Sequence, residues 1–142
     1  MPVVQFHLID TPANRDGAGR LLEGACALYA EVLAAPIERI RGFVTFHDPG
    51  HFLAAGALCS DNGRNAPFFE FIVLEGRSLA QRQRLLEGFT ALLVETLAVE
   101  REAIRGCCRR VPPEDWGIGG VPASEKRRDE IAARAEAGAG KG

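Results

Sequence analysis

Arg20–Gly42 reads RLLEGACALYAEVLAAPIERIRG, and Arg84–Gly106 reads RLLEGFTALLVETLAVEREAIRG. Aligned at an offset of 64 residues, the two stretches are identical at 14 of 23 positions. Chance pairing at ordinary composition gives roughly one or two identities. With one residue inserted or lost upstream, Pro2–Leu8 aligns with Pro67–Val73 in the same way. The chain therefore contains two diverged copies of one unit of roughly 60 residues.

Each copy follows the order strand, helix, strand. Val3–Ile9 and Phe68–Leu74 are rich in β-branched and aromatic residues and are largely apolar on both faces, which is typical of buried strands. A helix with one apolar stripe follows in each copy, and then a second strand near Arg41–Phe46 or Ile104–Arg110. Units of this length predict right-handed crossovers between parallel strands. The expected fold is α+β: a tandem β-α-β repeat with a four-stranded sheet and two helices on one face.

The repeat predicts one compact domain with four segments. Residues 1–58 form the first copy, residues 59–66 form a linker dense in turn formers, and residues 67–122 form the second copy. Residues 123–142 are predicted to form a C-terminal helix with a solvent-exposed charged face, followed by a flexible tail. Because a two-layer sheet leaves one face uncovered, oligomerisation is expected.

Composition excludes several classes of function. The chain has 142 residues, 46% apolar and 25% charged, as in globular proteins, and its formal net charge of −2 provides no attraction to nucleic acid or anionic membranes. No apolar run approaches the ~20 residues that span a bilayer, and the first residues do not resemble a signal peptide. The four cysteines form no C-x-x-C pair and favour a reducing, cytoplasmic location. His47 and His51 are separated by a proline turn that forbids a helix, so no metal site is predicted.

Pro2 is the first candidate for chemistry. If the initiator methionine is removed, the chain begins with a secondary amine. Ordinary α-amino groups titrate near 7.7–8.0, and burial or nearby cations lower that value further. Such an amine is a base suited to proton transfer near neutral pH, although proline is also simply suited to a chain start. Because the nitrogen of its copy, Pro67, is an amide, one amine site per chain is predicted.

Three arginines lie where the repeat changes direction. Arg77 follows the third strand, and Arg41 and Arg105 open the second strand of each copy. Arginines at strand ends are usually solvated surface charges. Arg41 and Arg105, however, persist with their neighbours in two diverged copies. Because a guanidinium group suits a dicarboxylate or an enolate, these residues are candidates for binding negative charge.

Together these motifs resemble the tautomerase superfamily, typified by 4-oxalocrotonate tautomerase. The resemblance runs through Pro2–His7 and Leu33–Pro36 in the first copy, and through Leu74–Ser78 and Gly117–Gly120 in the second. It implies the fold of macrophage migration inhibitory factor. A fused pair is similar to the longer members, of the length of the chloroacrylic acid dehalogenases and malonate semialdehyde decarboxylase, which form homotrimers. It also implies a small carboxylic-acid substrate and no cofactor.

The resemblance also implies roles for individual residues. Pro2 would be the general base that moves a proton within a small enol or unsaturated 2-keto acid. Arg77 matches the arginine that binds the substrate carboxylate. Arg41 matches the arginine that polarises the 2-keto oxygen, typically from a neighbouring subunit, and Arg105 is its copy.

Further positions would line the substrate site. Phe52 and Trp116 match an aromatic residue that packs against the proline, and Trp116 is expected to face it. Ile118 stands where the trans-specific dehalogenases carry a water-activating glutamate. Glu114 and Asp115 lie nearby and could activate water instead.

Departures from the family pattern favour isomerisation. Leu74 replaces the second arginine of the dehalogenases, and Arg39 replaces the aspartate of the decarboxylases. The sequence therefore predicts an enzyme, a cofactor-independent tautomerase. A hydratase or dehalogenase of unsaturated or halogenated acrylic acids, and a non-catalytic binding protein, remain as alternatives.

Overall fold

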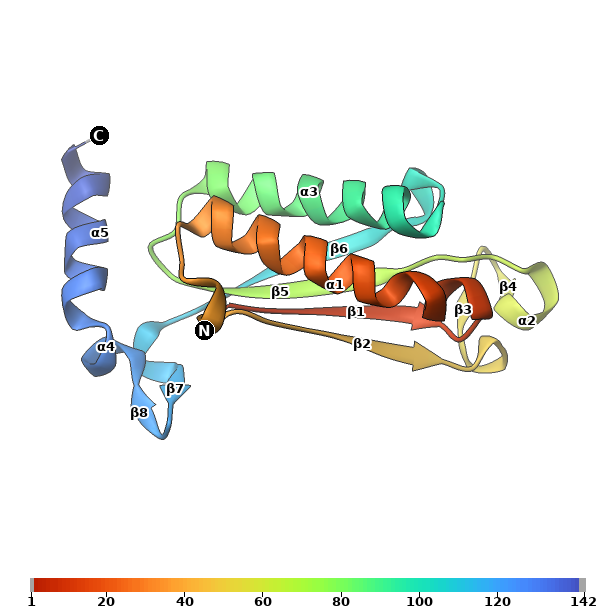
Figure 1. Cartoon of the computed structure of the whole chain (residues 1–142), viewed down its shortest axis with the longest axis horizontal. Coiled ribbons are helices and arrows are strands. Elements are labelled where there is room, and N and C mark those ends of the chain that lie inside the picture. The colour runs from red at the N-terminus through yellow and green to blue at the C-terminus, as the bar shows by residue number, and fades with distance from the viewer. Residues whose placement is uncertain (1, 141–142) are drawn as a thin grey trace.

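The computed structural model describes residues 2–140, in which two strand–helix–strand units follow one another (Figure 1). The first copy comprises β1 (Val3–Ile9), α1 (Pro12–Leu33), the 3₁₀ turn η1 (Ile37–Arg39), β2 (Arg41–His47), η2 (Pro49–His51), β3 (Leu53–Ala54), β4 (Ala57–Leu58) and α2 (Cys59–Asn62). The second comprises β5 (Phe68–Leu74), α3 (Leu79–Leu97), η3 (Arg101–Ala103), β6 (Arg105–Val111), η4 (Pro113–Asp115), β7 (Gly117–Ile118), β8 (Val121–Pro122) and α4 (Ala123–Lys126). A last helix, α5 (Arg128–Gly140), follows the second copy.

The strands form one sheet in the order β2-β1-β5-β6. β1 and β2 are parallel, as are β5 and β6, whereas the central pair β1 and β5 is antiparallel. In that central pair Val3 lies opposite Ile72, and His7 lies opposite Phe68. Both long helices cover the same face of the sheet (Figure 1), which confirms the predicted α+β arrangement. The antiparallel centre brings Pro2 to the carboxyl end of β5 and sends Pro67 to the opposite end of the sheet.

The core lies between the helices and the sheet. Alternate residues of β1 and β5 face the helices, as the two-residue period of a strand requires. The buried aromatic side chains in this layer are Phe6, Tyr29, Phe69, Phe71 and Phe89. The Tyr29 hydroxyl donates a hydrogen bond to the Ile72 carbonyl, and burial raises the pKa of Tyr29. The duplicated sequence therefore builds one shared core.

The ends of the copies differ in detail from the sequence expectation. The predicted linker, residues 59–66, begins with the helical turn α2, in which Cys59 is buried. This turn is the counterpart of α4 in the second copy, so the first copy keeps its regular structure beyond residue 58. The C-terminal segment, in which a flexible tail was expected, is helical as far as Gly140, and residues 141–142 lie outside the described residues.

The face of the sheet opposite the helices is uncovered. Phe43 and Phe68 are among the large apolar side chains exposed there. His7 Nδ1 lies 2.8 Å from His47 Nε2, and the His7 ring stacks near Phe68. Across residues 2–140, no helix combines the length and the apolar composition needed to cross a membrane.

Gly106 in β6 provides a test of how tightly this core is packed. A Cβ atom at this position would overlap ring carbons of Phe69, which is fully buried. We therefore expect Gly106→Ala to destabilise the fold by about 2 kcal/mol, because overpacking forces neighbouring side chains to shift. Urea unfolding at one fixed protein concentration measures the change.

Gly19→Ala is the matched control, since nothing lies within 4 Å of a Cβ there and the residue is inside α1. This variant should gain about 0.5–1 kcal/mol from helix propensity. Equal stabilities of the two variants would contradict the packing assigned to Gly106.

Candidate active site

The N-terminus, the end of β5, the β7–β8 hairpin and helix α5 gather at one end of the sheet (Figure 1). Pro2 is buried there, and its carbonyl accepts a hydrogen bond of 3.0 Å from the Arg41 backbone N–H. The equivalent bond in the second copy joins the Arg105 N–H to the Pro67 carbonyl at 3.1 Å. The repeat thus sets the same local geometry twice, at opposite ends of the sheet. Met1, whose removal the proline base requires, lies outside the residues that the structure describes.

Arg77 reaches the Pro2 end through the turn that links β5 to α3. Gly76 takes a φ of 108°, a conformation that favours glycine, and Ser78 caps α3 in a reciprocal capping box with Gln81. The Nη1 atom of Arg77 donates a hydrogen bond of 2.9 Å to the Leu33 carbonyl at the end of α1. Burial, together with the nearby Arg134 cation, lowers the pKa of Arg77 to about 10. Its positive charge is therefore poorly compensated in this structure.

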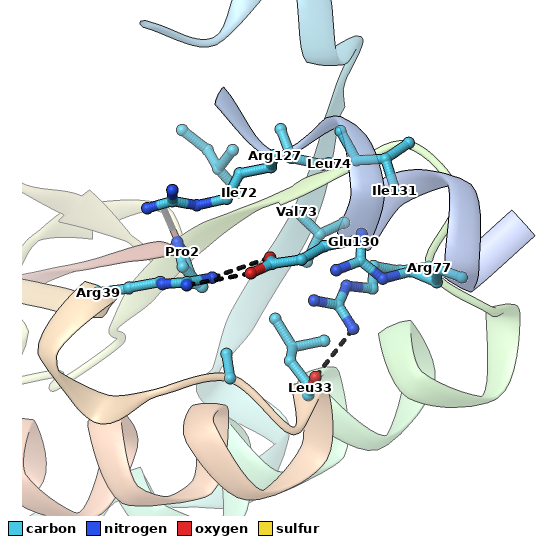
Figure 2. A pocket seen from close by; sticks show the side chains of 12 residues that line it. Pro2, Leu33, Arg39, Ile72, Val73, Leu74, Arg77, Arg127, Glu130 and Ile131 are labelled. Carbon is cyan, nitrogen blue, oxygen red and sulfur yellow. Dashed lines mark hydrogen bonds and ion pairs between the residues drawn. The ribbon is translucent and has the colours of Figure 1, made fainter. Parts of the chain in front are cut away.

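Pro2 and Arg77 line one pocket between the sheet end and α5 (Figure 2). The pocket has a volume of about 30 Å³, which is room for a water molecule and not for an organic acid. The lining residues are Pro2, Leu33, Ala35, Arg39, Ile72, Val73, Leu74, Arg77, Arg127, Glu130, Ile131 and Arg134. Four guanidinium groups therefore surround one carboxylate beside the proline.

The carboxylate is that of Glu130 on α5, and it pairs with Arg39. Arg39 Nη1 donates to Glu130 Oε2 at 2.9 Å, and Nη2 donates to Oε1 at 3.1 Å, so the pair is bidentate (Figure 2). The hydrogen bonds from Arg39 lower the pKa of Glu130, and the same contact raises the pKa of Arg39. Burial lowers the pKa of Arg134 in the same pocket. The charged face of α5, expected to be solvated, is thus partly turned into this pocket, where Glu130 pairs with Arg39.

A larger open hollow of about 400 Å³ adjoins this pocket. Arg39 and Arg127 line both spaces, so the two share a wall. Arg41, Trp116 and Ile118 line the hollow, but none of the three lines the Pro2 pocket. The predicted site residues at this end are therefore divided between a closed pocket and the open hollow beside it.

Four other predicted residues lie elsewhere. Phe52 and Arg105 line a separate hollow with Pro67, at the opposite end of the sheet. Glu114 and Asp115 are exposed in η4, and neither lines the Pro2 pocket or the hollow beside it. Within one chain, the structure therefore brings together Pro2 and Arg77, with Arg41, Trp116 and Ile118 close by, and separates these from the remaining four.

Sequence reasoning did not assign a site role to Arg39 or to α5. Two signals point to them. The repeat counterpart of Arg39 is Ala103, so this charge is present in the copy that carries Pro2 and absent from the other copy. Arg127, Glu130, Ile131 and Arg134 follow the i, i+3, i+4, i+7 spacing of one helix face.

The arrangement suits proton transfer on an anionic organic molecule. Pro2 is buried beside guanidinium groups, which bind carboxylates with two parallel hydrogen bonds and stabilise developing negative charge. Within residues 2–140, no group of three or more His, Cys, Asp or Glu side chains is placed to hold a metal ion.

Comparisons with known proteins agree with this geometry. Residues 67–126 match the model of the family described as "Tautomerase enzyme". A 2-hydroxymuconate tautomerase of Comamonas testosteroni is 40% identical over 62 residues, which are 98% of that protein and 44% of this chain. Relatives of this kind thus have the length of one copy.

Solved structures share the two-copy fold. The protein Pt0534, inactivated by 2-oxo-3-pentynoate, superposes with a TM-score of 0.79 and 22% identity, covering 87% of this chain and 98% of that one. A fused 4-OT that forms an asymmetric trimer has a TM-score of 0.78 and 21% identity, covering 89% and 99%. The chain belongs to the tautomerase superfamily of enzymes, as a member in which two β-α-β copies are fused.

Proposed function

We propose that this chain is a cofactor-independent tautomerase that uses Pro2 as its general base on a small enol or unsaturated 2-keto acid. The observation that carries the proposal is that Pro2 is buried in a pocket with Arg77. A secondary amine at the chain start supplies the base, and the guanidinium group supplies the charge that holds the substrate carboxylate.

The reaction is a proton transfer with no net change in composition. The neutral Pro2 amine takes the proton from the enol hydroxyl, and the electron pair of the broken O–H bond forms the carbonyl. The conjugated double bonds shift along the chain, and the prolinium ion returns the proton to a carbon atom. Arg41, from the hollow beside the pocket or from a neighbouring subunit, stabilises the oxygen while it is negative.

The same reasoning extends to assembly, domain limits and location. The exposed apolar residues of the uncovered sheet face support a homotrimer, the state named for the similar fused 4-OT structure. We propose that the two copies, residues 1–58 and 67–122, act as one domain joined by residues 59–66. The four cysteines are free, which supports a reducing cytoplasmic location.

Isomerisation is favoured over hydration of an unsaturated acid. Glu114 and Asp115, the candidates for activating water, are exposed and line neither space at the Pro2 end. In a small-molecule site the general base must be within hydrogen-bond reach of its proton. The location of the two acids therefore supports the tautomerase proposal.

Labelling with an acetylenic keto acid tests the proposal directly. 2-Oxo-3-pentynoate inactivates the similar protein Pt0534, and a neutral amine can add to such a conjugated alkyne without any leaving group. We expect the mass spectrum of the purified chain to lack Met1. After treatment, we expect one added probe mass located on Pro2, with loss of 2-hydroxymuconate ketonisation in parallel.

The matched control is 2-oxopentanoate, which has the same carbon chain and keto acid group but no alkyne, and it should leave no conjugate-addition adduct. Retention of Met1 would leave the Pro2 nitrogen an amide, and together with an active protein it would rule out the proposed base. Labelling of a cysteine in place of Pro2, with activity intact, would do the same.

A further inference from the structure

We propose that Arg39 is a further anion-binding residue of the Pro2 site and that Glu130 of α5 is its internal ligand, which must leave before a substrate can enter. This inference rests on the proposed function, because it assigns the pocket around Pro2 to an organic acid. It adds a residue and a moving element to that site.

The first observation is the geometry of the pair. Arg39 holds the Glu130 carboxylate through two parallel hydrogen bonds of 2.9 and 3.1 Å. Figure 2 shows the Glu130 carboxylate directed at the Arg39 guanidinium group, which lies next to Pro2, and shows Arg77 on the other side of Glu130. A substrate carboxylate would use the same two N–H groups of Arg39. Glu130 therefore occupies the space, and makes the contacts, expected of a bound acid.

The second observation is an excess of positive charge. Arg39, Arg77, Arg127 and Arg134 face the pocket, and Glu130 is the one acidic side chain in its lining. Arg127 also has a buried Nε atom with no hydrogen-bond partner among the described residues. Buried donors of this kind normally have acceptors. The pocket is therefore built to accept more negative charge than Glu130 supplies.

The third observation is that α5 is weakly attached. Arg127, which joins α4 to α5, has a non-helical φ of −121° and ψ of 26°, so the chain changes direction there. Of the side chains described in α5, Ile131 and Arg134 are partly buried and the rest are exposed. The side chains of Arg39 and Glu130 are 28% and 46% exposed. Because α5 has few buried side chains, its local detachment from the sheet end costs little free energy. Detachment is also necessary, because the pocket of about 30 Å³ is too small for an organic acid while Glu130 lies in it.

Calorimetric titration of the full-length chain with hexanedioate and with hexanoate tests the proposal. The two acids have the same length but carry two carboxylates or one. Removing the internal ligand with Glu130→Gln should tighten hexanedioate binding by about fivefold, because the competing ion pair is exposed and modest in strength. Hexanoate has one carboxylate and cannot bind Arg39 and Arg77 together, so it should gain less affinity than hexanedioate.

Two further variants identify the cause. Asp129→Asn removes one negative charge from the same helix, at an exposed position outside the pocket, and should leave both affinities unchanged. Arg39→Gln, added to Glu130→Gln, should abolish the preference for hexanedioate.

The proposal is overturned if Glu130→Gln brings no gain for hexanedioate, if Asp129→Asn brings an equal gain, or if the gain survives without Arg39. Binding is read without turnover. If the binding result contradicts the role of Arg39 and Glu130, the role of Pro2 is still decided by the labelling experiment. If labelling excludes Pro2 as the base, the binding measurement still tests Arg39 and Glu130.

Discussion

Replacing Pro2 by alanine is expected to lower kcat/KM for ketonisation of 2-hydroxymuconate by about 10²- to 10³-fold, within the range that a positioned general base contributes. Alanine still offers an amine once Met1 is removed, but it is a primary amine without the ring. The proline ring is buried against the end of the sheet and holds the nitrogen in the pocket. An alanine nitrogen is free to rotate and binds water, so it loses this positioning. Steady-state kinetics of the correctly processed protein measure the loss.

The duplication supplies an internal control for this variant. Pro67 occupies the same place in the second copy and is also buried, but its nitrogen is a peptide amide. Pro67→Ala removes the same ring from the other end of the sheet. It should therefore preserve the activity of the folded protein to within about threefold. Full activity in the Pro2→Ala protein would show that the proline ring does not position the base, and equal losses in both variants would assign the loss to the fold and not to proton transfer.

Arg77→Gln is expected to lower kcat/KM by about 10- to 100-fold, mainly through a higher KM. Hydrogen bonds from a charged group to a bound carboxylate are worth about 1.5–3 kcal/mol. Glutamine keeps one N–H donor group but loses the positive charge and the two parallel hydrogen bonds of the planar guanidinium group. The bond from Arg77 to the Leu33 carbonyl is also lost, whereas the cost of burying its cation is removed. We therefore expect stability to change little, and thermal unfolding checks this.

Two companions make the interpretation specific. Arg77→Lys keeps a positive charge but lacks the planar guanidinium group that donates two parallel hydrogen bonds, so it should recover only part of the lost affinity. Arg84→Gln removes an arginine whose exposed ion pair with Glu31, at 3.2 Å, lies outside the pocket. It should have no effect on KM. A KM unchanged in Arg77→Gln would show that this guanidinium group does not hold the substrate.

Much of the fold could be predicted because the determining patterns are local. The limits of β1 and β5 agree with the prediction from their apolar residues. β2 and β6 extend one residue beyond the predicted strands, to His47 and Val111. Sheet pairing, which composition alone does not report, sets these ends. The duplication also predicted that the nitrogen of Pro2 can become a free amine on removal of Met1, whereas the nitrogen of Pro67 is always a peptide amide.

The site was predicted only in part, because it is assembled by long-range packing. Arg77 was identified from its motif, but it meets Pro2 through the antiparallel pairing of β1 with β5. Phe52 and Trp116 are equivalent in the repeat and yet lie at opposite ends of the sheet. Neither fact follows from near-neighbour spacing.

The sequence by itself determined the two copies, their strands and helices, and the placement of Pro2 in one half and Arg77 in the other. These follow from residue periodicity, backbone propensity and the chemistry of a chain start. Only the tertiary structure decided that Arg39 and α5 belong to the same pocket. An ion pair such as Arg39–Glu130 spans 91 residues, and its partners are selected by the shape and charge of the sheet end once it has formed.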